Sequence, residues 1–435
     1  SELGRATSTA CKALKGRVLL YAASPLWNGS FPNPNWRNAN YETPGYGTEL
    51  VSTSYSRDKW ERARTACEEA IAAALGAGNR SFYTLEASEM QRMSENVPLP
   101  DIPGTDDEFK KKVMKMRYAM NAVETEGNRE IVWGVISNPD SYIFWQADAY
   151  PHNILSLNGG GNGGGICAMA PLLYAAEHFY TRNGILPKDD YEIPNSEWFR
   201  SAGYYGREDI IKLNDKREPR FYAWLSFDGD EYSSLIRNGQ PLIIDTKSST
   251  AQGYNPEMFN RDNNATGYYL KKWCQPNVSW NNDGSLNARQ VPAPLIRLSE
   301  LYLNLAECEA ELEHTDAALD ALNEVRRHAG IKELTSGDLS GMTLRDWVRN
   351  ERFVELFAEG HRYYDTRRWM IAPNVLRSGV REGLNAIAKK DPTFEEFNQR
   401  IKVDQPFQWD DRMYLLPIPS SEIYNNPQLV QSPGY

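Results

Sequence analysis

Residues 292–331 read PAPLIRLSELYLNLAECEAELEHTDAALDALNEVRRHAGI, and residues 342–369 read MTLRDWVRNERFVELFAEGHRYYDTRRW. From Ala293 onward, apolar side chains recur every three or four positions, which is the spacing of one buried stripe on an amphipathic helix. The stripe consists of Leu298, Leu301, Tyr302, Leu305 and Leu312. We therefore expect a helix that begins near Ala293 and packs one face against the protein interior.

A second helix is predicted directly after the first. Thr315 is a suitable N-cap, and Gly330 stands where a left-handed C-terminal cap would end the helix. The inward face consists of small or branched side chains, namely Ala317, Ala318, Ala321, Leu322 and Val325. Because only a few residues separate the two helices, we expect them to lie antiparallel as a hairpin.

A third helix is predicted from Thr343 to Gly360. Asp346 follows Thr343 at the third position, which is close to a capping box, and Gly360 is suited to close the helix. The end of this segment and the residues after it are rich in charge: Arg349, Glu351, Arg352, Glu355, Glu359, Arg362, Asp365, Arg367 and Arg368. Such a mixture of signs favours a structural network of ion pairs.

An enzyme is the alternative reading of the same glutamates. Glu351 and Glu355 lie one helical turn apart, which separates side chains by about 6 Å. That spacing is close to the roughly 5 to 5.5 Å between the two carboxyl groups of a retaining glycosidase. A glycosidase that uses Glu351 and Glu355 therefore stays open, although the interleaved arginines favour a structural role.

Small residues at helical spacing also mark residues 3–24 and 57–75, where Trp60 precedes a series of alanines. This is the pattern of tetratricopeptide-type hairpins, in which alanine lets two helices approach closely. Further helices are predicted at 107–123 and 171–183, and short strands at 130–136, 241–245 and 267–273.

These patterns predict a mainly α fold of tetratricopeptide-like helical hairpins with long irregular insertions and a few short strands. No clean linker interrupts the sequence, so we expect residues 1–435 to form a single domain. Its helical scaffold would comprise about 1–24, 57–76 and 293–369, and an irregular ligand-binding part would span about 130–292.

The composition argues against several classes of protein. A net charge of -10 and a pI near 5.3 disfavour nucleic-acid binding, which needs a basic face. No uninterrupted apolar stretch approaches the roughly 20 residues of a membrane-spanning helix. The histidines and cysteines form no H-E-x-x-H or C-x-x-C motif, so we expect no metal and no other cofactor. We interpret Cys11, Cys67 and Cys308 as buried, small apolar residues.

A glycine-rich run places Gly159, Gly161 and Gly164 in the spacing G-x-G-x-x-G. A dinucleotide site also needs a preceding strand, a following helix and an acidic residue about 20 positions further on. The preceding residues, NILSLN, and the lack of alternating strands and helices do not supply that context. We interpret the run as a surface loop.

Aromatic residues in the loops are the stronger functional signal. The chain has 12 tryptophans and 24 tyrosines, many of them beside Asn, Gly and Pro. Aromatic faces stack on sugar rings while polar side chains bond to the hydroxyl groups, so such loops suit carbohydrate, and peptides can use similar surfaces. We predict that Trp145 is the stacking platform, because it lies between an extended segment and the glycine run. The predicted ligand-binding residues are Tyr142, Trp145, Tyr150, Asn153, Trp36, Tyr46 and Trp280.

The ordered set of motifs resembles the SusD/RagB family of outer-membrane nutrient-binding lipoproteins from Bacteroidetes. The segments that carry the resemblance are ACKALKGRVLLYAASPLWNG (10–29), EHFYTRNGILP (177–187), DKREPRFYA (215–223), TGYYLKKW (266–273), the helical pair quoted above, VRNERFVELFAEGHRYYDTRRW (348–369) and LLPIPSSEIYNNPQLVQSPGY (415–435). No single segment is decisive, but their order over the chain is specific.

The resemblance implies a protein that binds nutrients at the cell surface of the outer membrane and does not cleave them. It implies a SusC-like TonB-dependent transporter as partner and an oligosaccharide or polysaccharide as ligand, with peptides in some members. Family members usually begin with a signal peptide, a lipidated cysteine and a helical N-terminal portion, so we expect that this chain lacks that portion. Membrane contact would then occur only through the missing lipid anchor, and residues 351–368 would be structural. A tetratricopeptide scaffold that binds only protein is a further alternative.

Overall fold

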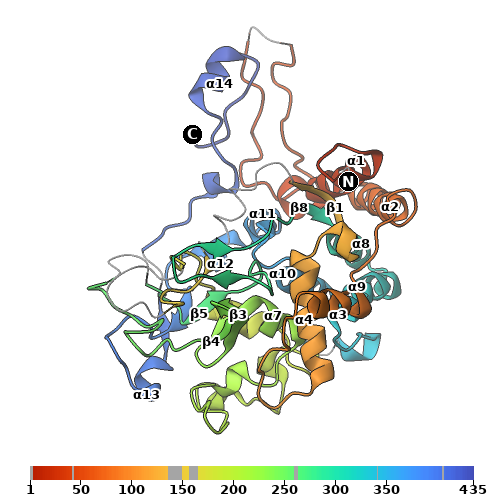
Figure 1. Cartoon of the computed structure of the whole chain (residues 1–435). Coiled ribbons are helices and arrows are strands. Elements are labelled where there is room, and N and C mark those ends of the chain that lie inside the picture. Colours follow the sequence, from red (N-terminus) through yellow and green to blue (C-terminus); the bar gives the residue numbers. More distant parts are fainter. Residues whose placement is uncertain are drawn as a thin grey trace.

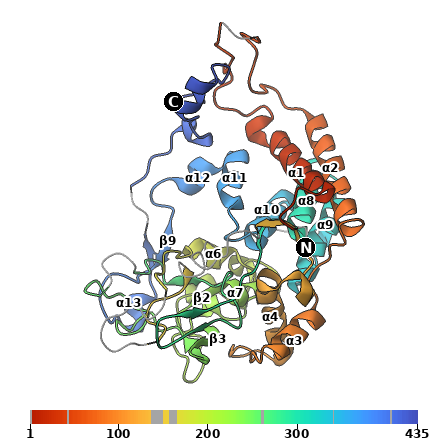
Figure 2. The same cartoon turned by 45° about the horizontal axis from the view of Figure 1, so that its top comes forward.

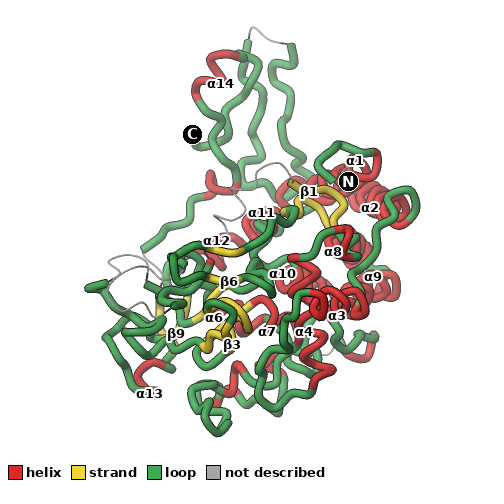
Figure 3. The backbone as a smooth tube through the Cα atoms, viewed as in Figure 1, coloured by secondary structure: helices red, strands yellow, loops and turns green. Residues whose placement is uncertain are grey.

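The computed structural model describes residues 3–41, 44–135, 149–155, 165–258, 263–339, 341–403 and 406–435. Long helices gather on one side of the molecule, and short strands, short helices and loops occupy the other (Figure 1). The C-terminal helix α14 (Ser420–Asn425) and two loop segments project from the body, and Figure 3 shows that this projection is mostly loop. The predicted mainly α fold with a few short strands is confirmed.

The first four long helices come from the N-terminal third of the chain, and the next group comes after residue 297. Their bounds are α1 (Ser8–Ala23), α2 (Arg57–Leu75), α3 (Leu85–Ser94), α4 (Asp107–Asn121), α8 (Leu298–Glu311), α9 (Thr315–Ala329), α10 (Leu344–Glu355) and α11 (His361–Arg368). Shorter helices are α6 (Leu173–His178), α7 (Pro219–Trp224), α12 (Ala372–Leu376) and α13 (Phe394–Phe397). Within the described part of the chain, no helix combines the length and the apolar character needed to cross a bilayer.

The strands are short and form small sheets. They are β1 (Ile131–Val135), β2 (Leu225–Phe227), β3 (Glu231–Arg237), β4 (Gln240–Ile243), β5 (Tyr268–Leu270), β6 (Ser279–Trp280), β7 (Leu286–Asn287), β8 (Ala293–Arg297), β9 (Glu382–Leu384) and β10 (Arg400–Lys402). Four of them form a sheet in the order β4-β3-β6-β7, in which β3 and β6 are parallel, and the others pair antiparallel as β1-β8, β2-β5 and β9-β10. The strands predicted at 130–136, 241–245 and 267–273 correspond to β1, β4 and β5.

Two helical hairpins, α1–α2 and α8–α9, build the scaffold, and α2 packs against α8 (Figure 2). Ala13 of α1 and Ala70 and Ala74 of α2 are buried in one cluster with Leu301 of α8. The alanines keep the helices close because no long side chain separates them. Gly330 ends α9 in the left-handed conformation (φ 74°), as predicted. The tetratricopeptide-like hairpins are therefore confirmed.

The start of the second hairpin differs from the prediction. Residues 293–297 form strand β8 and not the first turns of a helix, and β8 pairs antiparallel with β1. The Leu298 N–H then donates to the carbonyl oxygen of Glu130 (2.9 Å) as α8 begins. In a helix, the N–H groups of the first turn have no partner within the helix. Here residues 293–298 instead form backbone hydrogen bonds with the segment that contains Glu130 and β1. Periodicity alone does not reveal that partner.

The third predicted helix is broken in two. Helix α10 ends at Glu355, five residues before Gly360, and Gly360 instead precedes α11 as its N-cap. Ala358 (φ 59°) and Gly360 (φ 84°) both adopt left-handed conformations, which a continuing α-helix does not allow. Glu359 therefore lies in the turn between the helices, and not on the helical face of Glu351 and Glu355.

Five other details also differ. His314 rather than Thr315 precedes α9 as its N-cap, and Ala317 is exposed rather than on the inward face. The first helix begins at Ser8 rather than at residue 3, because the Thr7 side chain caps it by accepting from Ala10 N–H. The helix predicted over 171–183 is reduced to Leu173–His178. Cys67 and Cys308 are buried as expected, but Cys11 is exposed on α1.

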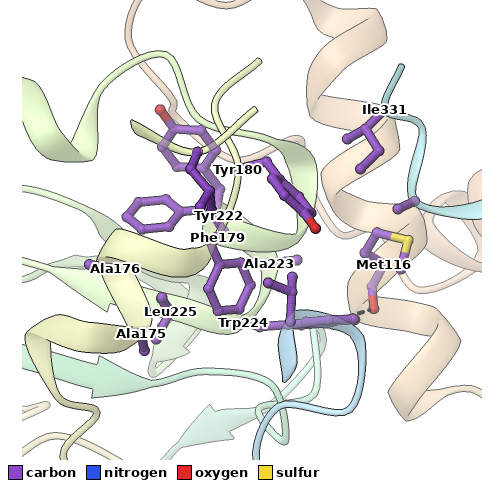
Figure 4. Packing of buried hydrophobic residues seen from close by; sticks show 14 of the residues in the cluster. Met116, Ala175, Ala176, Phe179, Tyr180, Tyr222, Ala223, Trp224, Leu225 and Ile331 are labelled. Atoms are coloured by element: carbon purple, nitrogen blue, oxygen red, sulfur yellow. Dashed lines mark hydrogen bonds between the residues drawn. The ribbon is translucent and has the colours of Figure 1, made fainter. Parts of the chain in front are cut away.

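The largest hydrophobic cluster lies where α6, α7, β2 and the scaffold helices meet. Phe179 and Trp224 contact each other at its centre, with the ring planes nearly perpendicular (79°), and the Trp224 indole donates to the carbonyl oxygen of Met116 (3.2 Å) (Figure 4). The sequence predicts an irregular segment with short strands over 184–292, and α7 and β3 within it were not predicted. Both are almost wholly buried, and β3 buries Glu231, Ser233 and Ser234 together with its apolar residues, so neither segment shows the alternation of a half-exposed element.

The capping box of α10 leads to a first prediction. The Thr343 hydroxyl oxygen accepts from Asp346 N–H (3.1 Å), and the Asp346 carboxylate accepts from the Thr343 hydroxyl (2.7 Å). Replacing Thr343 with alanine should lower the free energy of unfolding by about 1 kcal/mol, because the cap is lost without disturbing the core. Urea denaturation measures this value, and Thr343→Ser should retain most of it. Equal stability of the alanine variant and the original chain would contradict the capping role.

We call this projection the arm; its described residues are 30–41, 44–55 and 415–435. Its two segments lie side by side (Figures 1 and 2), and the Asn40 side chain donates to the carbonyl oxygens of Pro427 (2.8 Å) and Leu429 (3.3 Å). At its base, Phe31 and Val51 are buried in a small cluster with Tyr414. The arm therefore joins the early part of the chain to its last residues.

Candidate functional site

The predicted charge network is present and is buried. Arg220 of α7 donates to three carboxylates: Glu218 (2.8 Å), Glu351 (2.6 Å) and Glu355 (2.8 Å), and all four side chains have no exposed surface. Arg326 of α9 takes the second oxygen of Glu351 (2.9 Å). The centre of the network is thus Arg220, which lies outside the segment 349–368 in which the sequence analysis predicted the network.

Glu359 and Glu355 are paired from the other side. Arg297, the last residue of β8, binds Glu355 (2.7 Å) and Glu359 (2.7 Å), and Lys272 also binds Glu359 (2.6 Å). Burial by itself would raise the pKa of Glu355, but the charges of Arg297 and Arg220 outweigh it and hold the pKa far below its ordinary value. Burial also opposes ionisation of Glu359, and Arg297 and Lys272 lower its pKa to about 2.

This arrangement does not support the glycosidase alternative. A glycosidase needs one carboxyl group that stays protonated near neutral pH and so has a raised pKa. Glu355 has the opposite shift, and both Glu351 and Glu355 have each oxygen bound to an arginine in the interior. Neither carboxylate is free to meet a substrate.

A second buried group of charges continues the network. Arg352 and Arg368 both bind Asp365 (2.9 and 2.8 Å), and Arg368 also binds Glu307 (2.5 Å). Burial opposes ionisation of Asp365, but Arg352 and Arg368 lower its pKa to about 2. The prediction that these residues are structural is consistent with their complete pairing.

Arg362 and Arg367 do not join the network, although the sequence reading included them. Both face a cavity of about 590 Å³ between α6, α10, α11 and α12. Arg381 reaches the same cavity, and the aromatic rings of Tyr174 and Phe353 form part of its wall. We refer to this space, defined by Tyr174, Phe353, Arg362, Tyr363, Arg367 and Arg381, as the arginine cavity. The sequence alone does not show which arginines of this segment bind carboxylates and which face the cavity, because both kinds alternate along the same stretch of chain.

The predicted ligand residues are divided among separate places. Tyr142 and Trp145 lie outside the described residues. Tyr150 is buried, with its ring edge-on to Trp280 (5.9 Å between centroids), in the cluster beneath the four-stranded sheet. Asn153 is also buried and donates to the carbonyl oxygen of Ala251 (2.6 Å).

Tyr150 and Asn153 therefore serve as anchors in the described structure. Cys167 N–H donates to the carbonyl oxygen of Tyr150 (3.0 Å), and Gln252 donates to the carbonyl oxygens of His152 (3.0 Å) and Asn153 (3.3 Å). These bonds tie residues 150–153 to the loops that contain Cys167 and Gln252, and the Tyr150 ring contacts Trp280 of the sheet. Aromatic residues beside Asn and Gly in sequence can be buried in this way, and local composition does not distinguish them from exposed ones.

Trp36 and Tyr46 belong to the arm, which lies away from the four-stranded sheet (Figures 1 and 2). Trp36 stacks on Phe31 (5.6 Å) at the base of the arm. Tyr46 stacks on Tyr41 (4.2 Å), and these two rings are 51% and 81% exposed, so they form an accessible aromatic pair. The structure thus does not bring the predicted residues of the arm together with Tyr150 and Trp280.

The described residues contain no group of three or more His, Cys, Asp or Glu side chains placed to hold a metal ion. The described part of the chain therefore offers aromatic surfaces and cavities rather than a metal centre.

Comparison with known proteins identifies the class. The model of the SusD family matches residues 113–435, which is well over half of the chain. The chain therefore belongs to the SusD family, whose members are known as carbohydrate-binding proteins at the cell surface of Bacteroidetes and generally bind without catalysis.

Particular relatives agree with this assignment. The chain is 51% identical to the solved structure of BT4246, with a TM-score of 0.93, over 100% of this chain and 72% of that one. A SusD-like protein from Bacteroides fragilis NCTC 9343 shares the fold at 21% identity and a TM-score of 0.57, over 99% of this chain and 81% of that one. The SusD-like protein P25 of Formosa agariphila is 32% identical over 141 residues, which are 32% of this chain and 23% of that protein.

Proposed function

We propose that this chain binds a glycan at the outer-membrane surface and delivers it to a SusC-like TonB-dependent transporter, and that the full-length protein is held there by a lipid anchor. The match to the SusD family over residues 113–435 is the observation that carries the proposal. The buried, fully paired Glu351 and Glu355 favour binding over hydrolysis. A peptide ligand is the alternative within the same class of protein.

The proposed contact residues are Tyr142 and Trp145. Tyr150, Asn153 and Trp280 would support them, because Tyr150 follows Trp145 by five residues in the chain and is anchored on Trp280 and on Cys167 N–H. Tyr46, together with Tyr41, offers a separate exposed aromatic pair on the arm, and Trp36 holds the base of that arm. The exposed rings of Tyr41 and Tyr46 are suited to stacking on a sugar ring.

Replacing Trp145 with alanine should weaken glycan binding at least tenfold, because a stacking platform for a sugar ring is lost. Affinity electrophoresis against a panel of glycans, with a peptide panel beside it, measures the effect. Tyr205→Ala is the matched control, because Tyr205 is a fully exposed ring in another loop. Unchanged affinity of Trp145→Ala for every bound glycan would contradict the assignment of this residue.

The same panel separates the alternatives. Binding of peptides but not of glycans would favour the peptide-binding member of the family. Association with a transporter in the absence of any saccharide or peptide affinity would favour a scaffold that binds only protein. Release of reducing ends from a polysaccharide, lost in Glu355→Gln, would favour the glycosidase.

A further inference from the structure

The arginine cavity holds three guanidinium groups on aromatic faces. Arg362 lies over the rings of Phe353 (5.0 Å) and Tyr174 (5.4 Å) and donates to the Tyr174 hydroxyl oxygen (3.1 Å). Arg367 lies over the ring of Tyr363 (3.6 Å) and donates to the Tyr363 carbonyl oxygen (2.9 Å). These contacts orient both side chains, because the planar guanidinium stacks on the ring while its N–H groups bind oxygen.

Arg381 approaches the same space from the loop before β9. It donates to the carbonyl oxygen of Leu376 (3.0 Å) and lies over the ring of Phe407 (5.6 Å). Its partners, like those of Arg362 and Arg367, are carbonyl, hydroxyl and aromatic groups. The three arginines thus come from two different segments, and all three have the same kinds of partner.

The positive charge of this cavity is not neutralised by the described residues. No aspartate or glutamate is among the described residues that line it, and none of the three arginines is within 4.0 Å of a described carboxylate. The fully buried Arg220, Arg352 and Arg368 behave differently, since each binds at least one carboxylate.

No carboxylate contributes to the pKa shift of Arg367 or to that of His178. Burial lowers the pKa of Arg367, and the tyrosines Tyr363, Tyr435 and Tyr364 oppose this shift. His178 stacks on Tyr174 (3.7 Å). Burial lowers the pKa of His178 to about 4, with a contribution from the charge of Arg362, so this histidine is neutral near pH 7.

We propose that the arginine cavity binds a saccharide that carries a carboxylate, a uronic acid unit within an oligosaccharide. The aromatic walls suit the apolar face of a sugar ring, and an arginine pairs with a carboxylate through two parallel hydrogen bonds. The volume of about 590 Å³ is within the usual range of ligand sites and admits more than one sugar unit. This inference rests on the proposed function and specifies the ligand class that the chain prefers.

A pair of matched ligands tests the charge requirement. The first is an oligogalacturonate, and the second is the same oligosaccharide with its carboxyl groups reduced to alcohols, which keeps the length and removes the charge. Isothermal titration calorimetry on the purified chain should show at least tenfold tighter binding of the acidic form at 50 mM NaCl. The preference should shrink at 500 mM NaCl, because salt screens the ionic contacts.

Variants locate the preference in the cavity. Arg362→Gln and Arg367→Gln should each abolish most of the acidic preference, while Arg367→Lys should retain part of it because the charge remains. Arg377→Gln is the matched control, since Arg377 is an exposed arginine four residues before Arg381 that does not line the cavity. Thermal unfolding of each variant confirms that the chain remains folded.

The outcomes are distinguishable. Equal affinity for the acidic and the reduced oligosaccharide, with both weakened by Trp145→Ala, would overturn this inference and leave the proposed function standing. An acidic preference that survives Arg362→Gln and Arg367→Gln would place the recognition elsewhere and also overturn it. Failure to bind any member of the glycan panel would overturn both the inference and the proposed function.

Discussion

Replacing Arg220 with methionine is expected to lower the free energy of unfolding by about 3–5 kcal/mol at pH 7. Arg220 is fully buried and binds Glu218, Glu351 and Glu355, which are buried as well. Without the guanidinium, carboxylates would remain in the interior with too few positive partners, and they would have to be desolvated or protonated on folding. Urea denaturation followed by circular dichroism measures the change.

Two further variants make the Arg220 result specific. Arg327→Met removes an arginine that also binds two glutamates, Glu324 and Glu333, but these side chains are about half exposed. Its loss should be small, because exposed ion pairs contribute little. Arg220→Lys should fall between the original chain and Arg220→Met, since one ammonium cannot reach three carboxylates in the guanidinium geometry. Equal losses for Arg220→Met and Arg327→Met would contradict a special role for the buried network.

The chain is expected to lose stability steeply as the pH falls from about 4.5 toward 2. The pKa values of Glu359 and Asp365 are about 2 in the folded state, whereas the ordinary values are 4.5 and 3.8. The unfolded chain therefore takes up protons first, and the stabilisation that is complete above the ordinary pKa disappears as the folded value is approached. For Glu359 alone the shift corresponds to a loss on the order of 3 kcal/mol.

The measurement is a series of urea denaturation curves between pH 7 and pH 2.5. Glu359→Gln should be less stable than the original chain at pH 7 and should show a shallower fall in acid, because one titrating group is gone. Glu333→Gln is the control, since Glu333 forms an exposed ion pair with Arg327. A pH dependence in Glu359→Gln as steep as that of the original chain would show that Glu359 does not contribute to it.

The scaffold was predictable from sequence because its signals are local. Alanines at helical spacing, the Gly330 cap and the Thr343–Asp346 capping box each depend on residues within a few positions. The structure confirms both caps and buries Ala318 and Ala321, although Ala317 is exposed. The strand β8 was not predictable in this way, since it exists through pairing with β1 about 160 residues earlier. The same holds for α7, whose six residues are buried on every side.

The candidate site was less predictable for a related reason. Tyr150 and Tyr46 stand in similar sequence surroundings, yet Tyr150 is fully buried while Tyr46 is 51% exposed. Arg362 and Arg368 lie six residues apart, and only Arg368 meets carboxylates, because Glu307 reaches it from α8. Which aromatic ring or arginine is accessible depends on segments that arrive from elsewhere in the chain.

The buried charge network has a consequence for how the chain folds. Arg220 lies 131 residues from Glu351 and 135 from Glu355, and Arg297 lies 58 from Glu355. Contacts between such distant positions form only after long loops have closed, and this slows folding relative to proteins stabilised by local contacts. A buried arginine without its glutamate, or a buried glutamate without its arginine, is unfavourable. The ion pairs therefore stabilise the native packing of α7, β8 and α10 and destabilise arrangements in which these elements are misplaced. The buried ion pairs therefore favour the one packing of the helical scaffold and the strand-rich part in which every charge is paired.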